Sequence, residues 1–510
     1  MSFFCRNVMV FMVAALATSL SWVYGGSRGD LLLSFVPWLS FLVLEGLFCF
    51  PQCHEGESHV HARERTWRSL RRDPLTWVSL AFVLLLLVPF VNKGLCQTCD
   101  YPEIMAGANP NPPNPNLPFC VNRINHLNVV MWFVPSLLVL LAVRHALTKH
   151  GKLMLLELLV WNGVALGLLG FIQLATGANG PLWSAGYEST EYFFSTFGYV
   201  NMGGDYFTVL FVLSLAVWSH RFDEARAESA EEDGPDRSNA WIRFVRAFRD
   251  RHYLLIASMI LFITSYNTRS RAAVMLTTAA AALVLLRISI VALAQMSAVQ
   301  RFRTVTVAAT MLVAMFVGGY IAMPLSVREE IRQTSVNSIF SRLTGRSEYH
   351  FSVAADILSE HKLFGVGGWG YSHFSAPKTP KSVSQYFRYS WARGGSNVHN
   401  DYLQFMAEHG LIGFGLMAAI FLLALWPTFL VWMSMARSIR FVKQLDLPSP
   451  RGLFIFPAGA FATLVALLCT LIHALADCPL RSPSVLMLFC IELTAIDGFL
   501  PLVRTTTKED

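Results

Sequence analysis

Long apolar runs alternate with short polar segments along the whole chain of 510 residues. A helix crosses the hydrocarbon core of a bilayer with about 20 apolar residues. Twelve runs approach or reach that length, and no internal repeat relates them. They centre on residues 7–24, 31–50, 75–92, 127–143, 153–176, 204–219, 253–268, 272–290, 304–324, 411–434, 452–476 and 483–501. The pattern predicts an all-α polytopic membrane protein with about twelve transmembrane helices.

The composition agrees with a membrane protein. The chain is 54% hydrophobic and only 14% charged, with a mean hydropathy of +0.46, whereas soluble domains carry about 25% charged residues. A disordered or collagen-like chain is excluded, because 38 Phe and 13 Trp residues are typical of packed interiors. The first run follows Arg6 and ends without a small-x-small cleavage site, so we interpret it as a retained helix.

The distribution of Lys and Arg predicts the orientation. If the N-terminus is inside, 25 of the 40 basic residues fall in inside segments, as expected for loops retained in the cytoplasm. We therefore place both termini in the cytoplasm and the protein in a bacterial inner membrane. Of the 15 outside residues, nine lie in one long loop, 325–410, and two in the tight turn 266–271.

This topology predicts three regions. Residues 1–324 form a membrane region of about nine helices, with an exposed cytoplasmic linker near 221–252. Residues 325–410 form a large periplasmic loop between helices nine and ten, and 411–510 contain three C-terminal helices. Four acids fall within predicted spans and receive no assigned role. They are Glu45, Glu157, Glu492 and Asp497.

The nine cysteines give little sign of a metal site. Cys96, Cys99 and Cys120 share a predicted outside loop, where an oxidising periplasm permits a disulfide. We favour Cys120 paired with Cys96 or Cys99 over a metal site with His126, because a single C-x-x-C is a weak zinc signal. A second cluster is interpreted as a solvated cytoplasmic loop. It consists of Cys53, His54, His59 and His61. No metal and no cofactor are expected.

The two arginines in the outside turn need a stronger reason than solvation. The spans on either side, 253–268 and 272–286, reach about 24 Å of a core about 30 Å thick. Arg269 and Arg271 are therefore expected near the depth of phosphate groups, which arginine binds with two parallel hydrogen bonds. Snorkelling to ordinary lipid phosphate is the alternative. A close pair that faces a second basic loop favours a bound anionic ligand.

The long loop supplies that second basic surface. It contains Arg342, Gly345-Arg346 and a glycine-rich stretch, 365–371, that lacks the Lys-Ser/Thr of a nucleotide P-loop. Residues 400–410 are predicted to form a short helix, with Asn400 or Asp401 as N-cap and Gly410 past its end. His399 directly precedes this helix, on the arginine side, where a base could meet an anionic substrate.

The order of these elements resembles the O-antigen ligase and polymerase superfamily. The similar elements are Ser270-Arg271, Gly345-Arg346, Gly365 to Gly370, and NVHNDYLQFMAEHGLIG at 397–413. The resemblance covers roughly 260–425, and HALADCPLRSP at 473–483 is similar to the C-terminal part of the family. Two positions differ: Ala272 follows Arg271 where the family often has glycine, and His350 follows Arg346 where an aromatic residue is common.

The resemblance implies a metal-independent, inverting glycosyltransferase at the periplasmic face. Its donor would be an undecaprenyl-diphosphate-linked glycan, and its acceptor a hydroxyl of lipid A core or of a growing polysaccharide. Membrane lipids would be its other partners, and no nucleic acid is expected. A transporter or flippase of lipid-linked anionic sugars, or a protein O-oligosaccharyltransferase, is the alternative.

The resemblance also implies roles for individual residues. Arg271 and Arg346 match the arginines that stabilise the departing diphosphate, with Arg269 and Arg342 as supporting cations. His399 matches the histidine that orients or deprotonates the acceptor hydroxyl. Possible supporting residues are Asp401, which could orient His399 or cap the helix, together with Asn400, Gly367 and Asp477. Asp477 and Arg481 are expected to pair with each other or to face the donor site.

Overall fold

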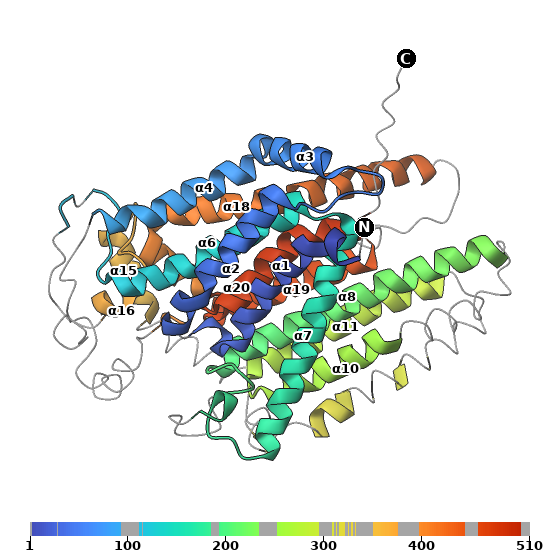
Figure 1. Cartoon of the computed structure of the whole chain (residues 1–510). Coiled ribbons are helices and arrows are strands. Elements are labelled where there is room, and N and C mark those ends of the chain that lie inside the picture. The colour runs from blue at the N-terminus through green and yellow to red at the C-terminus, as the bar shows by residue number, and fades with distance from the viewer. Residues whose placement is uncertain are drawn as a thin grey trace.

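A computed structural model gives the arrangement of the helices (Figure 1). It describes residues 3–27, 29–92, 112–114, 116–184, 193–233, 252–294, scattered positions between 306 and 332, 350–375, 397–443 and 457–500. Within these ranges the regular structure is helical, and the β-pairing found there is one isolated bridge between Phe194 and Phe197. The all-α prediction is therefore confirmed for the described residues.

Fourteen α-helices and five short 3-10 helices are described. The N-terminal half contains α1 (Phe3–Trp22), η1 (Tyr24–Gly26), α2 (Gly29–Cys49), α3 (His59–Arg72), α4 (Pro74–Leu87), η2 (Val88–Phe90), α6 (Arg123–Ala146), α7 (Lys149–Ala175), η3 (Pro181–Trp183) and α8 (Val200–Asp233). The C-terminal half contains α10 (His252–Asn267), α11 (Arg271–Ala294), α15 (Ser352–Glu360), α16 (Gly370–Ser375), α18 (Asp401–Lys443), α19 (Ala458–Ala476), η7 (Pro479–Arg481), α20 (Pro483–Ala495) and η8 (Ile496–Phe499).

Six described helices are long and apolar enough to cross a membrane. They lie in α2, α6, α7, α8, α18 and α19, and a seventh span results if α3 and α4, bent by 67°, count as one. Arg6–Trp22 and His252–Asn267 are shorter apolar helices. The chain is thus a helical membrane protein, whereas the count of twelve spans is not confirmed. The run 304–324 is described only in part.

The two ends of α6 have different chemistry. At its C-terminal end, Arg144 contacts Asp73, the residue between α3 and α4, at 2.6 Å. The exposed face of α3 carries several arginines. At the N-terminal end of α6, His126 Nδ1 accepts a hydrogen bond of 3.1 Å from the Gly368 amide. The basic helix α3 and the glycine-rich stretch therefore lie at opposite ends of α6, as Figure 1 shows for α3 and for α15 and α16.

Helix α8 is the central element on the other side of the bundle, where it packs against α10, α11 and α19. Hydroxyl groups join three of these helices: Thr208 Oγ1 lies 3.2 Å from Ser265 Oγ and 2.8 Å from Thr277 Oγ1. Such interhelical hydrogen bonds are a common source of packing specificity within membranes. They fix the turn between α10 and α11 relative to α8. Helix α8 also continues to Asp233, so the first part of the expected linker is helical.

Helix α18 is broken at Gly410, whose backbone has φ 65° and ψ −174°. The amides of Leu411 and Ile412 donate to the carbonyls of Lys362 and Leu363, so the chain turns against the segment after α15 before the membrane part begins. The predicted short helix that ends at Gly410 is confirmed. These first residues of α18, 401–409, are called the arm below (Figure 1).

The four acids of the predicted spans differ in their surroundings, and Glu45, in α2, is exposed. Asp497 forms an ion pair of 2.6 Å with Lys152, and Glu157 accepts a hydrogen bond of 3.3 Å from the Tyr253 hydroxyl. Glu492 is buried in α20, and neither of its carboxylate oxygens has a hydrogen-bond partner among the described residues. Asp497 and Glu157 thus connect helices.

The expected disulfide at Cys120 is wrong. Cys120 is a free, buried thiol whose Sγ contacts the Pro89 carbonyl oxygen at 3.6 Å. Burial raises the pKa of this thiol to about 11. The packing of residues 119–121 beneath the glycine-rich stretch leaves the thiol enclosed, while Cys96 and Cys99 lie outside the described residues.

Candidate active site

His399 occupies a strained position immediately before α18. Its backbone has φ 55°, a left-handed conformation that is uncommon for a residue with a Cβ and is typically enforced by surrounding structure. The next residue, Asn400, begins the helix, because its Oδ1 accepts from the Leu403 amide at 3.0 Å. The Asn400 amide group also donates to the Leu475 carbonyl at the end of α19. Asn400 therefore caps α18 and fixes the start of that helix against α19.

The His399 ring contacts Asp477. His399 Nδ1 lies 3.2 Å from Asp477 Oδ1, and the two side chains are 29% and 5% exposed. A neutral imidazole that donates from Nδ1 presents its other nitrogen, Nε2, as an acceptor. A partly exposed histidine with a buried carboxylate partner is the arrangement by which a general base is oriented.

The Asp477 carboxylate is held by four further donors, one of them the Cys478 thiol, whose Sγ lies 3.3 Å from Oδ1. Its Oδ2 accepts from the Tyr199 hydroxyl at 2.9 Å and from the Asn201 amide, and Oδ1 accepts from the Cys478 amide at 2.8 Å. Burial opposes ionisation, but the hydrogen bond and charge of His399 outweigh it and hold the pKa of Asp477 well below its usual range. Asp477 is therefore a fixed anion beside His399.

Asp401 has a different role from the one considered for it. Its Oδ2 accepts from the Leu480 amide at 2.9 Å, so the carboxylate ties the start of α18 to η7. It neither caps α18, which Asn400 does, nor orients His399, which Asp477 does. The sequence could not rank the two acids, because Asp477 is 78 residues from His399 and only the packing of α18 on α19 brings it there.

The glycine-rich stretch packs directly on the arm that carries His399. The amides of Val366 and Gly367 donate to the Ala407 and Glu408 carbonyls. Gly367 has φ 80°, and a Cβ at this position would lie 2.3 Å from the Phe119 carbonyl oxygen. Only glycine fits such a close backbone approach. Gly367 therefore allows the glycine-rich stretch to pack between residues 119–120 and the arm.

Arg481 is paired with Glu408, where a pair with Asp477 was one of the two expectations. Arg481 Nη1 lies 3.0 Å from Glu408 Oε2, and its guanidinium lies 4.3 Å from the ring centroid of Trp369. Glu408 Oε1 also accepts from Gln404 Nε2 at 3.2 Å. The buried ion pair joins η7 to α18, and the cation–π contact of the same arginine joins η7 to the glycine-rich stretch.

The tight turn places Arg271 at the start of α11. Ser270 Oγ accepts from the Ala273 amide at 3.2 Å, so Ser270 is the N-cap and Arg271 the first helical residue. Arg269 has φ 65° and lines a cavity of about 130 Å³ with Gln173 and Ser195. The two arginines are therefore in different backbone conformations. Arg342 and Arg346 lie outside the described residues.

Helix α8 connects this turn to the histidine. A Cβ at Gly204 would lie 2.7 Å from the Ser270 Cβ, which shows how closely the turn packs on α8. Asn201, three residues earlier and on the same face of that helix, donates to Asp477. The Ser-Arg turn and the pair formed by His399 and Asp477 are therefore at the same end of the helix bundle.

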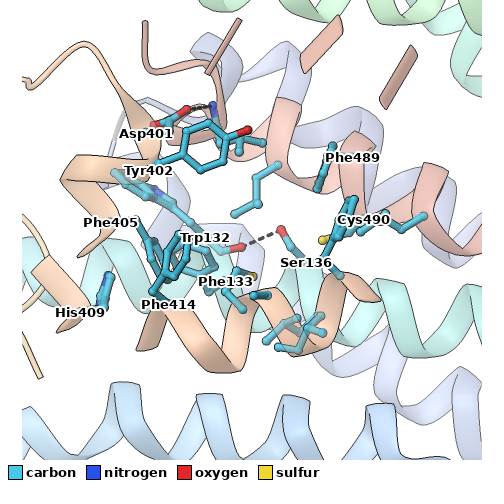
Figure 2. Close-up of a pocket in the computed structure, with 18 of the residues that line it drawn as sticks. Trp132, Phe133, Ser136, Asp401, Tyr402, Phe405, His409, Phe414, Phe489 and Cys490 are labelled. Carbon is cyan, nitrogen blue, oxygen red and sulfur yellow. Dashed lines mark hydrogen bonds between the residues drawn. The ribbon is translucent and has the colours of Figure 1, made fainter. Parts of the chain in front are cut away.

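An apolar cavity of about 420 Å³ has Asp401 and Tyr402 in its lining, two and three residues after His399. It is formed by residues of α6, α18, α19, η7 and α20, and its polar lining includes Asp401, Tyr402, Glu408 and Arg481. In Figure 2, Asp401 and Tyr402 lie at one end of this pocket, and Phe489 and Cys490 face them across it. The cavity has the size of a ligand site, and its apolar walls suit a hydrocarbon chain.

Three potential metal ligands meet at the same place. His399, Asp477 and Cys478 each offer one ligand atom, and these atoms lie within 4.8 Å of one another. No metal was expected from the sequence, where only the cysteines near 96–120 and the cluster at 53–61 were considered as ligands. Asp477 and Cys478 are adjacent in the sequence, but nothing in the sequence placed that pair beside His399.

Part of this chain is similar to a known protein family. Residues 256–418 match the O-antigen ligase family. This confirms the resemblance drawn from the sequence for that region of a helical membrane protein. No curated protein matches the chain.

The O-antigen ligase region covers only part of the site. It includes the tight turn, the glycine-rich stretch and His399. Asp477, Tyr199 and Asn201 lie outside it, although all three belong to the hydrogen-bond network around His399. Tyr199 and Asn201 belong to no local motif that marks them in the sequence.

Proposed function

We propose that the protein transfers or polymerises a glycan carried on undecaprenyl diphosphate, joining it to an acceptor hydroxyl at the periplasmic face of the bacterial inner membrane. In this proposal about twelve spans place both termini in the cytoplasm, and a large periplasmic loop lies between helices nine and ten. The observation that carries the proposal is the contact between His399 and Asp477, at the same end of the bundle as the Ser-Arg turn.

His399 is the proposed base. With Nδ1 hydrogen-bonded to Asp477, Nε2 accepts the proton of the acceptor hydroxyl. The hydroxyl oxygen forms the new bond to the anomeric carbon, while the bond from that carbon to the diphosphate oxygen breaks. The electron pair leaves with the diphosphate. Attack on the face opposite the leaving group inverts the configuration, and the fixed Asp477 anion stabilises the imidazolium that forms.

Arginines are the proposed partners of the leaving group. Diphosphate is already a good leaving group, so the main requirement is positive charge where negative charge develops. Arg271, and Arg346 in the same proposal, supply it without a metal, with Arg269 and Arg342 as supporting cations. Charge-assisted hydrogen bonds of this kind contribute about 1.5 to 3 kcal/mol each.

The apolar cavity supports a lipid-linked donor. Its lining is largely aliphatic and aromatic, and its polar end begins at Asp401 and Tyr402, two and three residues after His399. A hydrocarbon chain in this cavity would hold its head group beside the histidine. Phe405 and Phe133, whose rings are 5.7 Å apart, form part of the wall along which the chain would lie.

The test incubates purified protein with a labelled undecaprenyl-diphosphate glycan and, separately, lipid A core, polysaccharide and a protein acceptor. A ladder of lengthening chains indicates a polymerase, one discrete conjugate a ligase, and labelled protein an oligosaccharyltransferase. Label that crosses vesicles but never leaves the polyprenyl carrier would overturn the proposal in favour of a transporter. The matched control for His399→Gln is His361→Gln, which replaces the histidine that ends α15 and packs on Phe119.

A further inference from the structure

The ligand atoms of His399, Asp477 and Cys478 lie close enough together to hold a metal ion. Asp477 Oδ1 lies 3.2 Å from His399 Nδ1 and 3.3 Å from Cys478 Sγ. Ligand atoms around a tetrahedral zinc ion, at about 2.0 to 2.3 Å from the metal, are about 3.3 to 3.6 Å apart. Two edges of such a tetrahedron are therefore nearly formed already, and the third is within 4.8 Å.

The donor types select the metal. One imidazole nitrogen, one carboxylate oxygen and one thiolate sulfur are the set that Zn²⁺ prefers, whereas Mg²⁺ and Ca²⁺ require mainly oxygen ligands. Ionised Asp477 and Cys478 with neutral His399 carry two negative charges, which one divalent cation neutralises. A neutral cluster is the state that a buried environment favours.

The surroundings supply support and access. Tyr199 and Asn201 hold the other carboxylate oxygen, Oδ2, so that Oδ1 is fixed in direction. Hydrogen bonds of this kind commonly orient metal-ligating carboxylates. The His399 side chain is 29% exposed while Asp477 and Cys478 are buried, so solvent reaches the cluster from the His399 side.

We propose that these three residues bind Zn²⁺, and that the bound cation inhibits the transferase. Binding releases the Cys478 thiol proton to solvent and moves the Nδ1 proton of His399 to Nε2. With the metal on Nδ1, Nε2 carries a hydrogen and can no longer accept the proton of an acceptor hydroxyl. The inhibitory consequence rests on the proposed function, whereas the binding itself does not.

The binding test uses Co²⁺ as a spectroscopic substitute for Zn²⁺ on the purified full-length protein. We expect a thiolate-to-cobalt charge-transfer band that Zn²⁺ abolishes by competition. Cys478→Ala should lose this band, and Cys469→Ala, which removes another buried cysteine of the same region, should keep it. Thermal unfolding of both variants shows that they are folded. No band in the parent protein, or a band that persists in Cys478→Ala, would overturn the site.

The inhibition test measures glycan transfer with increasing Zn²⁺. We expect at least tenfold weaker inhibition in Cys478→Ala than in the parent protein and in Cys469→Ala, with recovery of activity on adding a chelator. The amide of residue 478, which donates to Asp477, is retained in the variant. Equal inhibition of all three proteins overturns the inhibitory role. If the parent protein transfers no glycan at all, the proposed function fails, and the cobalt titration still decides whether the site exists.

Discussion

Trp369 lies across the guanidinium of Arg481, with 4.3 Å between the Arg481 Cζ atom and the ring centroid. Trp369 itself has a left-handed backbone, φ 61°, within the glycine-rich stretch. On the other side, Arg481 binds Glu408 on the arm that carries His399. The contact therefore connects the glycine-rich stretch to η7, which follows Asp477.

Removing the charge of Glu408 should destabilise the protein. Glu408→Gln leaves the Arg481 guanidinium buried without its counter-charge, since the two side chains are 2% and 10% exposed. Breaking one partner of a buried pair costs about 3 to 5 kcal/mol. Thermal unfolding in detergent should show a clear decrease in melting temperature. Glu57→Gln removes a more exposed pair with Arg65 and should change stability by less than about 1 kcal/mol. Equal effects would contradict the buried role of Arg481.

Loss of the base should remove transfer while the fold remains. His399→Gln is expected to lower the transfer rate by about 10²- to 10⁴-fold, the usual contribution of a general base. Asp477→Asn should lower it as well, because the amide cannot provide the anion that stabilises the imidazolium. The measurement is single-turnover transfer of a labelled glycan at saturating donor, with unfolding curves beside it. Unchanged transfer in His399→Gln would remove this residue from the mechanism.

Transfer should depend on the two parallel hydrogen bonds that the Arg271 guanidinium can make to phosphate. Arg271→Lys keeps the charge but loses the paired hydrogen bonds to phosphate, so we expect reduced transfer in Arg271→Lys and a larger reduction in Arg271→Ala. Arg346→Ala should behave like Arg271→Ala. Ser270, the N-cap of α11, is unchanged in each Arg271 variant, which preserves the turn. Normal turnover in both alanine variants would exclude the diphosphate role.

Gly367 tolerates no side chain. In Gly367→Ala the new Cβ meets the Phe119 carbonyl oxygen at 2.3 Å, in addition to the cost of φ 80°. Gly56→Ala provides the matched control, because Gly56 has φ 76° with no atom within 4 Å of the added Cβ. We expect a larger fall in melting temperature for Gly367→Ala. Equal falls in the two variants would mean that backbone conformation alone, and not the close approach, matters.

Cys120 should resist alkylation across the neutral and alkaline range. An ordinary cysteine thiol has a pKa of about 8.5, so its labelling by a maleimide rises steeply between pH 7 and 9. The raised pKa of Cys120, about 11, keeps the thiol neutral in that range, and thiolate would form only above it. Mass spectrometry after labelling should find Cys120 unmodified until the protein is denatured. Labelling that appears only after reduction would instead support the disulfide.

The sequence predicted elements with a local cause and missed those that depend on packing. Apolar runs predicted the helices, and Asn400 with Gly410 predicted the arm at the start of α18, because caps and glycine turns act over a few residues. Asp477 was only a possible supporting residue, since its contact with His399 depends on how α18 meets α19. The predicted disulfide of Cys120 was wrong because the spacing of cysteines does not reveal the packing that encloses this thiol.

The break at Gly410 makes the rotation of the arm independent of the length of the membrane part of α18. One residue added to an α-helix rotates everything beyond it by about 100°. An insertion between 401 and 409 would turn His399 relative to Glu408, whereas an insertion after 412 would change only the membrane part of α18. Related chains could therefore adjust α18 to bilayers of different thickness without rotating the histidine.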